Sequence, residues 1–204
     1  MKNLSHIEVS EICHQLGNYT PKSIKPVYGG NIHYSWRIEF ENDIFFLKKN
    51  SKKKNFLKFE KYCLKNLEKN INKKILKIPK VIAYFRVKDV ELLLMDWIDM
   101  QNGDQNKLGK GLGEMHLKSA NSYPKKFGYP VEGYIGTTNQ KKGWENNWAD
   151  CFINLRIKPQ LLILKNNILD IKTKNLINEK IKLELTDYKP TNCLVHGDLW
   201  SGNI

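Results

Sequence analysis

Arginine is scarce in this basic chain. Lys and Arg together number 34 and give a formal net charge of +13, yet the only arginines are Arg37, Arg86 and Arg156. Bidentate binding of phosphates and bases favours the planar guanidinium group, so the scarcity argues against a nucleic-acid partner. Asn and Ile are also abundant, and their codons, like those of Lys, are AT-rich. We therefore interpret the lysine excess as a consequence of an AT-rich genome. A cleft lined by lysines would nevertheless suit an anionic ligand.

Cysteine is also sparse, and its four positions are far apart: Cys13, Cys63, Cys151 and Cys193. No two form a CxxC pair, which excludes the usual zinc-ligand spacing and a dense disulfide framework. No apolar run approaches the roughly 20 residues that a membrane helix needs, and the first residues lack the hydrophobic region of a signal peptide. We expect a cytoplasmic protein with reduced thiols and no membrane partner.

The first hundred residues have the pattern of an antiparallel sheet with helices. Apolar side chains at helical spacing predict helices at Leu4–Leu16 and Phe56–Leu67. Short runs between turn residues predict strands at Ile24–Val27, His33–Phe40, Ile44–Lys48, Val81–Arg86 and Val90–Asp96. In the second of these strands, alternation places Trp36, Ile38 and Phe40 on one face.

The pattern changes after Met100. Helical spacing predicts three helices, at Leu108–Ser119, Trp148–Lys165 and Asn175–Leu185. A short apolar run predicts a strand near the end, at Cys193–His196. We therefore expect an α+β fold of two lobes. Residues 1–98 would form the sheet lobe with one long helix, and residues 99–204 would form a mainly helical lobe.

The most informative segment is LVHGDLWSGN at positions 194–203. Asp198 and Asn203 lie five positions apart after the predicted strand, which is the spacing of the kinase catalytic loop H-x-D-x-x-x-x-N. A carboxylate at position 198 can orient an attacking hydroxyl and accept its proton. The amide oxygen of Asn203 can be a ligand for the Mg²⁺ that bridges the phosphates of ATP. The alternative is an Asx-rich surface turn, which explains less of the ten-residue string.

The string HGDLWSGN resembles the catalytic loop of the fructosamine (ketosamine) kinase family. Trp200 favours this family over the related aminoglycoside and choline phosphotransferases, which share the HGD and the Asn but usually lack the Trp. Residues 127–129 and the helix order W-x₃-F-x₃-R-x₃-Q at 148–160 are similar to the family as well. The resemblance implies that Trp148, Arg156 and Trp200 lie near the sugar-amine. A core-facing helix stripe remains the alternative for the first two.

The family resemblance also extends to the nucleotide-binding part of the chain. Lys48 ends a predicted strand and resembles the lysine that contacts the α- and β-phosphates. Alternation places its neighbour Lys49 on the other face of the strand. Glu60, on the next helix, resembles the glutamate that pairs with this lysine, although a solvated helix carboxylate would look the same.

Two backbone segments complete the expected nucleotide site. Gly29, Gly30 and Asn31 resemble the glycine-bearing loop of the family, in which backbone N–H groups can approach phosphates. A common hairpin turn is the alternative for two adjacent glycines. The strand that ends in Met95, Asp96, Trp97 and Ile98 resembles the hinge whose backbone contacts adenine.

The resemblance implies a protein-kinase-like fold and an ATP- and Mg²⁺-dependent kinase that phosphorylates a hydroxyl of small-molecule or protein-bound ketosamines. It covers about the first two thirds of the family's usual length, and the metal-binding aspartate of the later Asp-Pro pair has no counterpart. We therefore expect an incomplete second lobe and an inactive chain, either a fragment or a truncated product. The alternative functions are an aminoglycoside- or choline-type phosphotransferase and a non-catalytic nucleotide-binding module.

Overall fold

The computed structural model describes residues 3–29, 33–52, 54–100, 103–122, 124–165 and 168–199. The chain divides into two compact units. Unit 1 comprises Met1–Met115 and His196–Ile204, and unit 2 comprises His116–Val195. The boundary falls inside helix α3 (Gln105–Ser122).

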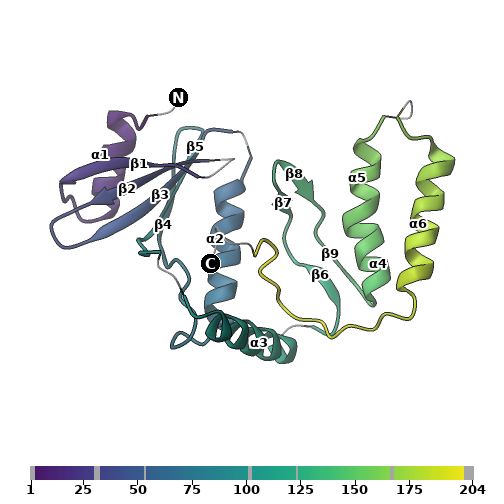
Figure 1. The fold of residues 1–204 in the computed structure, drawn as a ribbon. Coiled ribbons are helices and arrows are strands. Elements are labelled where there is room, and N and C mark those ends of the chain that lie inside the picture. The colour runs from purple at the N-terminus through teal and green to yellow at the C-terminus, as the bar shows by residue number, and fades with distance from the viewer. Residues whose placement is uncertain are drawn as a thin grey trace. The chain divides into compact units, whose positions relative to one another are not determined.

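A five-stranded antiparallel sheet forms the centre of unit 1 (Figure 1). Its strands lie in the order β1-β2-β3-β5-β4. Their bounds are β1 Ser23–Val27, β2 Tyr34–Glu39, β3 Ile44–Asn50, β4 Val81–Val87 and β5 Val90–Asp96. All five predicted strands are confirmed within a few residues. The β4–β5 turn places Lys88 at a φ of 53°.

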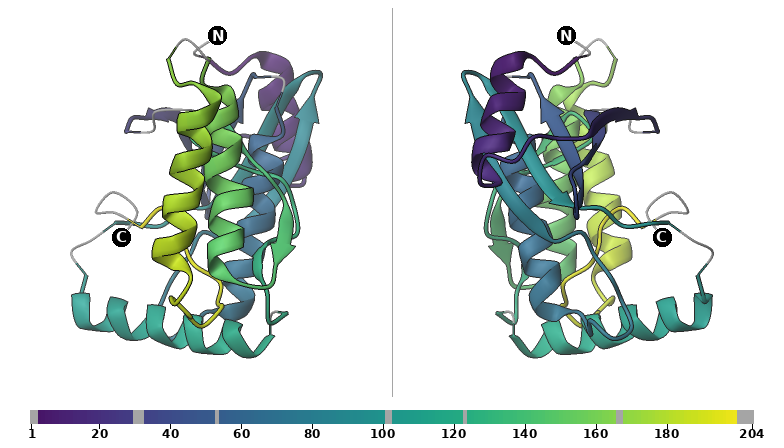
Figure 2. Two further views of the ribbon diagram at one scale, coloured as in Figure 1. Left: turned by 90° about the vertical axis from the view of Figure 1, so that its right-hand side faces the viewer. Right: turned by 90° about the vertical axis from the view of Figure 1, so that its left-hand side faces the viewer.

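The two faces of this sheet are covered by different helices, α1 (His6–Gln15) and α2 (Phe56–Asn70) (Figure 2). Ile12 of α1 packs with the buried side chains of Trp36, Ile38, Phe40, Leu47, Leu92 and Leu94. Leu57 of α2 packs with Leu93 and Met95 on the other face. Because successive side chains of a strand alternate between faces, β5 contributes to both cores. The shared face predicted for Trp36, Ile38 and Phe40 is confirmed.

Unit 2 contains a helical stretch followed by a second helix. The stretch consists of α4 (Trp148–Phe152), a π-helical segment η1 (Ile153–Ile157) and α5 (Lys158–Ile163), and α6 (Ile171–Leu185) lies beside it (Figure 2). The helix predicted at Trp148–Lys165 is thus confirmed, with a π-helical turn inside it. Unit 2 also has four three-residue strands that the sequence did not predict: β6 Phe127–Tyr129, β7 Gly133–Ile135, β8 Thr138–Gln140 and β9 Gly143–Glu145.

The predicted strand at Cys193–His196 is wrong. The described backbone there has neither helix nor strand geometry, because none of the strands found in the described residues lies alongside to complete a ladder. A side chain of α3 holds the segment instead: the N–H of Leu194 donates to Ser119 Oγ at 2.9 Å, and both residues are buried. Ser119 Oγ donates in turn to the carbonyl of His116.

The α+β class expected from the sequence is confirmed by the antiparallel sheet and the helices that follow it. None of the described helices has both the length and the apolar character that crossing a membrane requires. None of the four cysteines, all of which lie in the described part of the chain, forms a disulfide, and burial raises the pKa values of Cys13, Cys151 and Cys193.

Candidate functional site

Two adjacent lysines on β3 point to opposite faces of the sheet. Lys48 Nζ lies 2.6 Å from Glu60 Oε1 of α2, and each side chain is 27% exposed. Lys49 Nζ lies 2.8 Å from Glu8 Oε2 of α1, and each of these side chains is 4% exposed. The structure therefore contains the Lys48–Glu60 pair expected from the sequence. Only the lysine on the α2 face keeps enough exposure to meet a ligand.

The glycine-bearing loop begins at the end of β1 and leads into β2. In the sheet register, Val27 pairs with Ser35, and Ser35 pairs with Lys48. The loop therefore joins the sheet one strand away from Lys48. Gly29 has a φ of 120°, which side chains rarely adopt, and an added Cβ would have no neighbour within 4 Å. The positive φ, and not a lack of room for a side chain, is therefore the reason that this position favours glycine.

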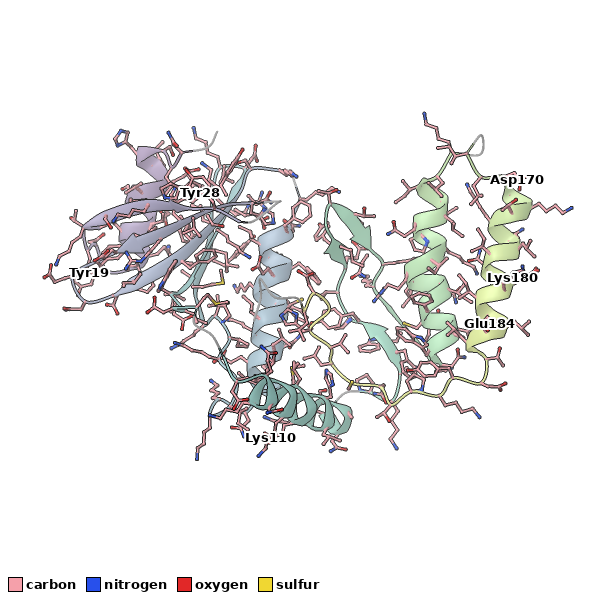
Figure 3. The ribbon with its side chains drawn as sticks, in the orientation of Figure 1. Tyr19, Tyr28, Lys110, Asp170, Lys180 and Glu184 are labelled. Carbon is pink, nitrogen blue, oxygen red and sulfur yellow. The ribbon has the colours of Figure 1, made fainter. Side chains whose placement is uncertain are left out.

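Gly30 and Asn31 lie outside the described residues. The adjoining Tyr28 is 88% exposed and is labelled in Figure 3. This exposure leaves its phenol ring in solvent at the start of the loop.

His33 adds a group that the sequence analysis missed. Its ring meets the Phe56 ring edge-on, with centroids 5.5 Å apart. Burial lowers the pKa of His33, nearby Glu60 opposes the shift, and Lys48 adds to it. Within the described part of the chain, its Nδ1 is buried without a hydrogen-bond partner. The one available sequence signal was a histidine directly after the glycine-bearing loop.

The predicted hinge continues β5 out of the sheet. Met95 is buried at 1% exposure. The N–H of Asp96 donates to the carbonyl of Lys80 at 3.0 Å, and the N–H of Trp97 donates to the carbonyl of Ile44 at 3.2 Å. Two of the hinge donors are thus used inside the protein, and Ile98 offers the next N–H along the chain.

Asp198 lies at an exposed position in the segment that follows Leu194. Its N–H donates to His196 Nδ1 at 3.3 Å, and Gly197 between them has a φ of 83°. The histidine thus holds the backbone of the loop, as a local hydrogen-bond acceptor. Trp200 and Asn203 lie outside the described residues.

Trp148 and Arg156, the expected substrate contacts, belong to unit 2. Trp148 stacks on Phe152 with centroids 5.6 Å apart and meets Phe127 edge-on at 6.0 Å. Arg156 Nη1 donates to the carbonyls of Lys141 and Leu155 at 3.2 and 2.9 Å. It also lines a cavity of about 260 Å³ with Ile135, Thr138, Asn139, Gln140, Leu155, Ile157 and Gln160. Trp148 is therefore held by aromatic packing, while Arg156 reaches a hollow.

Within unit 1, the structure brings Lys48, Glu60 and His33 close together. Among the described residues, no group of three or more His, Cys, Asp and Glu side chains could hold a metal ion. Mg²⁺ in phosphate-binding sites usually takes only one or two protein oxygens beside the phosphates and water, and the expected ligand Asn203 lies outside the described residues.

A family model described as fructosamine kinase matches residues 5–204 of the chain. A probable ketoamine kinase of Enterococcus faecium is 30% identical over 184 residues, which are 88% of this chain and 63% of that protein. The crystal structure of a putative fructosamine-3-kinase from Haemophilus somnus superposes with a TM-score of 0.80 at 24% identity, covering 96% of this chain and 66% of the other.

A more distant structural neighbour is a thermostable mutant of the aminoglycoside phosphotransferase APH(4)-Ia in a ternary complex with AMP-PNP and hygromycin B. It superposes with a TM-score of 0.57 at 14% identity, covering 96% of this chain and 65% of the other. These likenesses identify the fold as protein-kinase-like. The chain spans 60–63% of the length of the first three curated relatives that it matches.

Proposed function

We propose that this chain, which belongs to the fructosamine kinase family, carries the nucleotide site and catalytic loop of an ATP-dependent kinase acting on ketosamines. The observation that carries the proposal is the Lys48–Glu60 pair, 2.6 Å apart and partly exposed. It lies beside the strand that leaves the glycine-bearing loop. An ammonium group held by a carboxylate at this place suits the α- and β-phosphates of ATP.

The remaining nucleotide contacts follow from the backbone. Gly29, Gly30 and Asn31 would bring amide N–H groups close to the phosphates. The adenine edge would meet the hinge at Met95–Ile98. Because the N–H groups of Asp96 and Trp97 donate within the protein, Ile98 would supply the hinge donor.

Asp198 would orient the attacking hydroxyl of the acceptor and accept its proton. The His196–Asp198 hydrogen bond and the buried Leu194 support a defined backbone at this loop. Asn203 would supply one oxygen ligand to Mg²⁺. Arg156 lines a hollow and is proposed, with Trp148 and Trp200, to contact the sugar-amine.

The name of the Enterococcus relative points to a ketoamine substrate, and we propose a sugar hydroxyl of a ketosamine as the phosphate acceptor. Because the 204-residue chain is expected to be inactive, the test uses a chain extended to the length of its relatives. It measures transfer of the γ-phosphate of ATP to a ketosamine, an aminoglycoside and choline. We expect transfer to the ketosamine. Transfer only to one of the other acceptors would overturn the proposed substrate class.

Two substitutions test the roles of the residues. Asp198→Asn should lower transfer by about 100-fold or more, which is the usual contribution of a positioned base. Lys48→Met should weaken ATP binding, measured by calorimetry on the 204-residue chain. The exposed Lys110→Met is the charge-matched control and should bind ATP as the unmodified chain does (Figure 3). ATP binding that survives Lys48→Met unchanged would overturn the role of this lysine.

A further inference from the structure

Helix α2 carries Glu60 but lacks an N-terminal cap of its own. Its N-cap residue, Asn55, makes no side-chain capping hydrogen bond, and its first turn contains no acidic residue. The first amide groups of a helix have no partner within the helix, so they need an acceptor from elsewhere. Uncapped helices are less stable and fray at this end.

A carboxylate from the sheet supplies this acceptor. Glu91 of β5 is 0% exposed, and its side chain accepts the N–H of Leu57 on Oε2 and the N–H of Lys58 on Oε1, each at 3.3 Å. Leu57 and Lys58 are the second and third residues of α2. These are the two amides that an N-cap side chain normally binds. Glu91 therefore caps α2 from strand β5, although it lies 34 residues after Leu57 and 33 residues after Lys58 in the sequence.

Two further donors hold the same carboxylate. Asn50 Nδ2 donates to Oε2 and the Tyr84 hydroxyl donates to Oε1, each at 2.7 Å. Burial raises the pKa of Tyr84 to about 12, with the hydrogen bond to Glu91 adding to the shift, so the phenol stays a donor. Each Glu91 oxygen thus accepts two hydrogen bonds, and a buried group satisfied in this way has a fixed position.

The capped helix end lies next to both members of the Lys48–Glu60 pair. Glu60 follows Leu57 by three residues, which is the next turn of the same helix face. Asn50 follows Lys48 by two residues on β3 and pairs with Glu91 in the sheet register. One carboxylate therefore ties together the strand that carries the lysine and the helix that carries the glutamate.

We propose that Glu91 is a positioning residue: it caps α2 from within the sheet and thereby holds Glu60 against Lys48. Its effect on nucleotide binding rests on the function proposed above. The capping of α2 by Glu91 does not depend on that function, so the capping role and the effect on nucleotide binding can be tested separately.

The test is the rate at which an acetylating reagent labels individual lysines of the folded chain, read by tandem mass spectrometry. The pair with Glu60 should slow acetylation of Lys48. In Glu91→Gln, an amide NH₂ would replace one oxygen and face two of the four donors. One of the two capping hydrogen bonds would then be lost, and labelling of Lys48 should rise by roughly five-fold, the population change expected from about 1 kcal/mol of lost capping. Lys49, 4% exposed on the other face, should remain protected in the same sample.

The matched control is Asp170→Ala, which removes a cap from a different helix. Asp170 accepts the N–H of Thr173 at 2.7 Å at the start of α6 in unit 2 (Figure 3). An equal rise of Lys48 labelling in this control would overturn the proposal, because the effect would then be general destabilisation. An unchanged rate in Glu91→Gln would overturn it as well.

A rescue variant separates positioning from simple loss of stability. Asn55→Asp places a carboxylate at the N-terminus of α2, where the positive end of the helix dipole favours a negative charge. In the Glu91→Gln background, it should restore the slow labelling of Lys48. A double variant that regains stability but not this protection would contradict the proposal.

If Glu91→Gln does not fold, Tyr84→Phe removes one of the donors that hold the carboxylate and should still raise Lys48 labelling, and an unchanged rate would overturn the proposal. Adding ATP to the unmodified chain should slow Lys48 labelling. If ATP has no effect, the proposed nucleotide site is wrong, while the nucleotide-free comparison still decides the role of Glu91.

Discussion

Lys49 Nζ lies 2.8 Å from Glu8 Oε2, in an ion pair whose two side chains are each 4% exposed. The same ammonium donates to the carbonyl of Asn3 at 3.1 Å, so one lysine of β3 fastens the N-terminal segment to the sheet. Its neighbour Lys48 points to the opposite face and is 27% exposed. Two adjacent, chemically identical residues thus have different roles, and the alternation of the strand decides which role each has.

Breaking the buried pair from one side should be costly. Glu8→Gln would leave the ammonium of Lys49 buried without a carboxylate, and we expect the free energy of unfolding to fall by about 3–5 kcal/mol. Replacing both residues, as Glu8→Leu with Lys49→Met, removes the buried charges together. This double variant should lose only two hydrogen bonds, from the Ser5 N–H to Glu8 Oε2 and from Lys49 to the Asn3 carbonyl, together about 2 kcal/mol. Urea unfolding followed by circular dichroism compares the two, and equal losses would contradict the interpretation.

The same pair should contribute to acid unfolding. Burial opposes the ionisation of Glu8, but the hydrogen bonds from Lys49 and from the backbone of Ser5 outweigh it, so its pKa lies below the ordinary value of 4.5. A carboxyl with a lowered pKa in the folded state stabilises the fold above the unfolded-state value and loses this contribution as the pH falls through the folded value.

The stability difference between the unmodified chain and the Glu8→Leu, Lys49→Met variant therefore shifts against the unmodified chain as the pH falls below 4.5. Urea midpoints at pH 7, 4.5 and 3 measure this shift. Other carboxylates with lowered pKa values, such as Asp150 and Asp170, are present in both proteins and cancel in the comparison. A difference that stays constant across the series would mean that Glu8 is not responsible.

Much of unit 1 could be predicted from the sequence because its elements are long and regular. Alternation alone separated Lys48 from Lys49, and helical spacing located α2 with Glu60 on it. The partners Glu8 and Glu91 could not be found in this way. Each contacts its target across more than 30 residues of sequence, and nothing in a local pattern marks which buried carboxylate meets which donor.

The sequence predicted less of unit 2 for a physical reason. The strands β6 to β9 have three residues each, too few for alternation to be visible. Conversely, the apolar run Cys193–His196 had the composition of a strand, but a strand also needs a paired neighbour. Ser119 of α3 meets the backbone of Leu194 instead. Of the site, the approach of the catalytic loop to the nucleotide remains a prediction.

Replacing glycines of α3 with alanine should raise the free energy of unfolding at two positions and lower it at a third. A Cβ at Gly109 or Gly113 would meet nothing within 4 Å, whereas a Cβ at Gly111 would overlap the side chain of Leu76. Gly109→Ala and Gly113→Ala should each raise the free energy of unfolding by about 0.4–1 kcal/mol, because alanine loses less backbone freedom in a helix. Gly111→Ala should lower it by about 1–3 kcal/mol through overpacking. Thermal unfolding of the three single variants measures these changes. If Gly111→Ala stabilises the chain, α3 does not pack on Leu76.

The helices α5 and α6 expose large apolar side chains. Leu162 of α5 is 80% exposed and Leu183 of α6 is 77% exposed. A hollow of about 690 Å³ between these helices is lined in part by Leu161, Leu162, Leu164 and Ile171. Exposed apolar surface of this kind promotes association of chains in solution.

Replacing Leu162 and Leu183 with glutamine should therefore reduce aggregation and the binding of a hydrophobic dye. The free energy of unfolding should change by less than about 0.5 kcal/mol, as is usual for surface positions. Light scattering, dye fluorescence and urea unfolding measure the three quantities. Leu155→Gln is the matched control, because this leucine is only 6% exposed and its replacement should destabilise the chain by burying an amide. If the surface pair costs as much stability as the control, those leucines pack inside the folded chain and the apolar face does not exist.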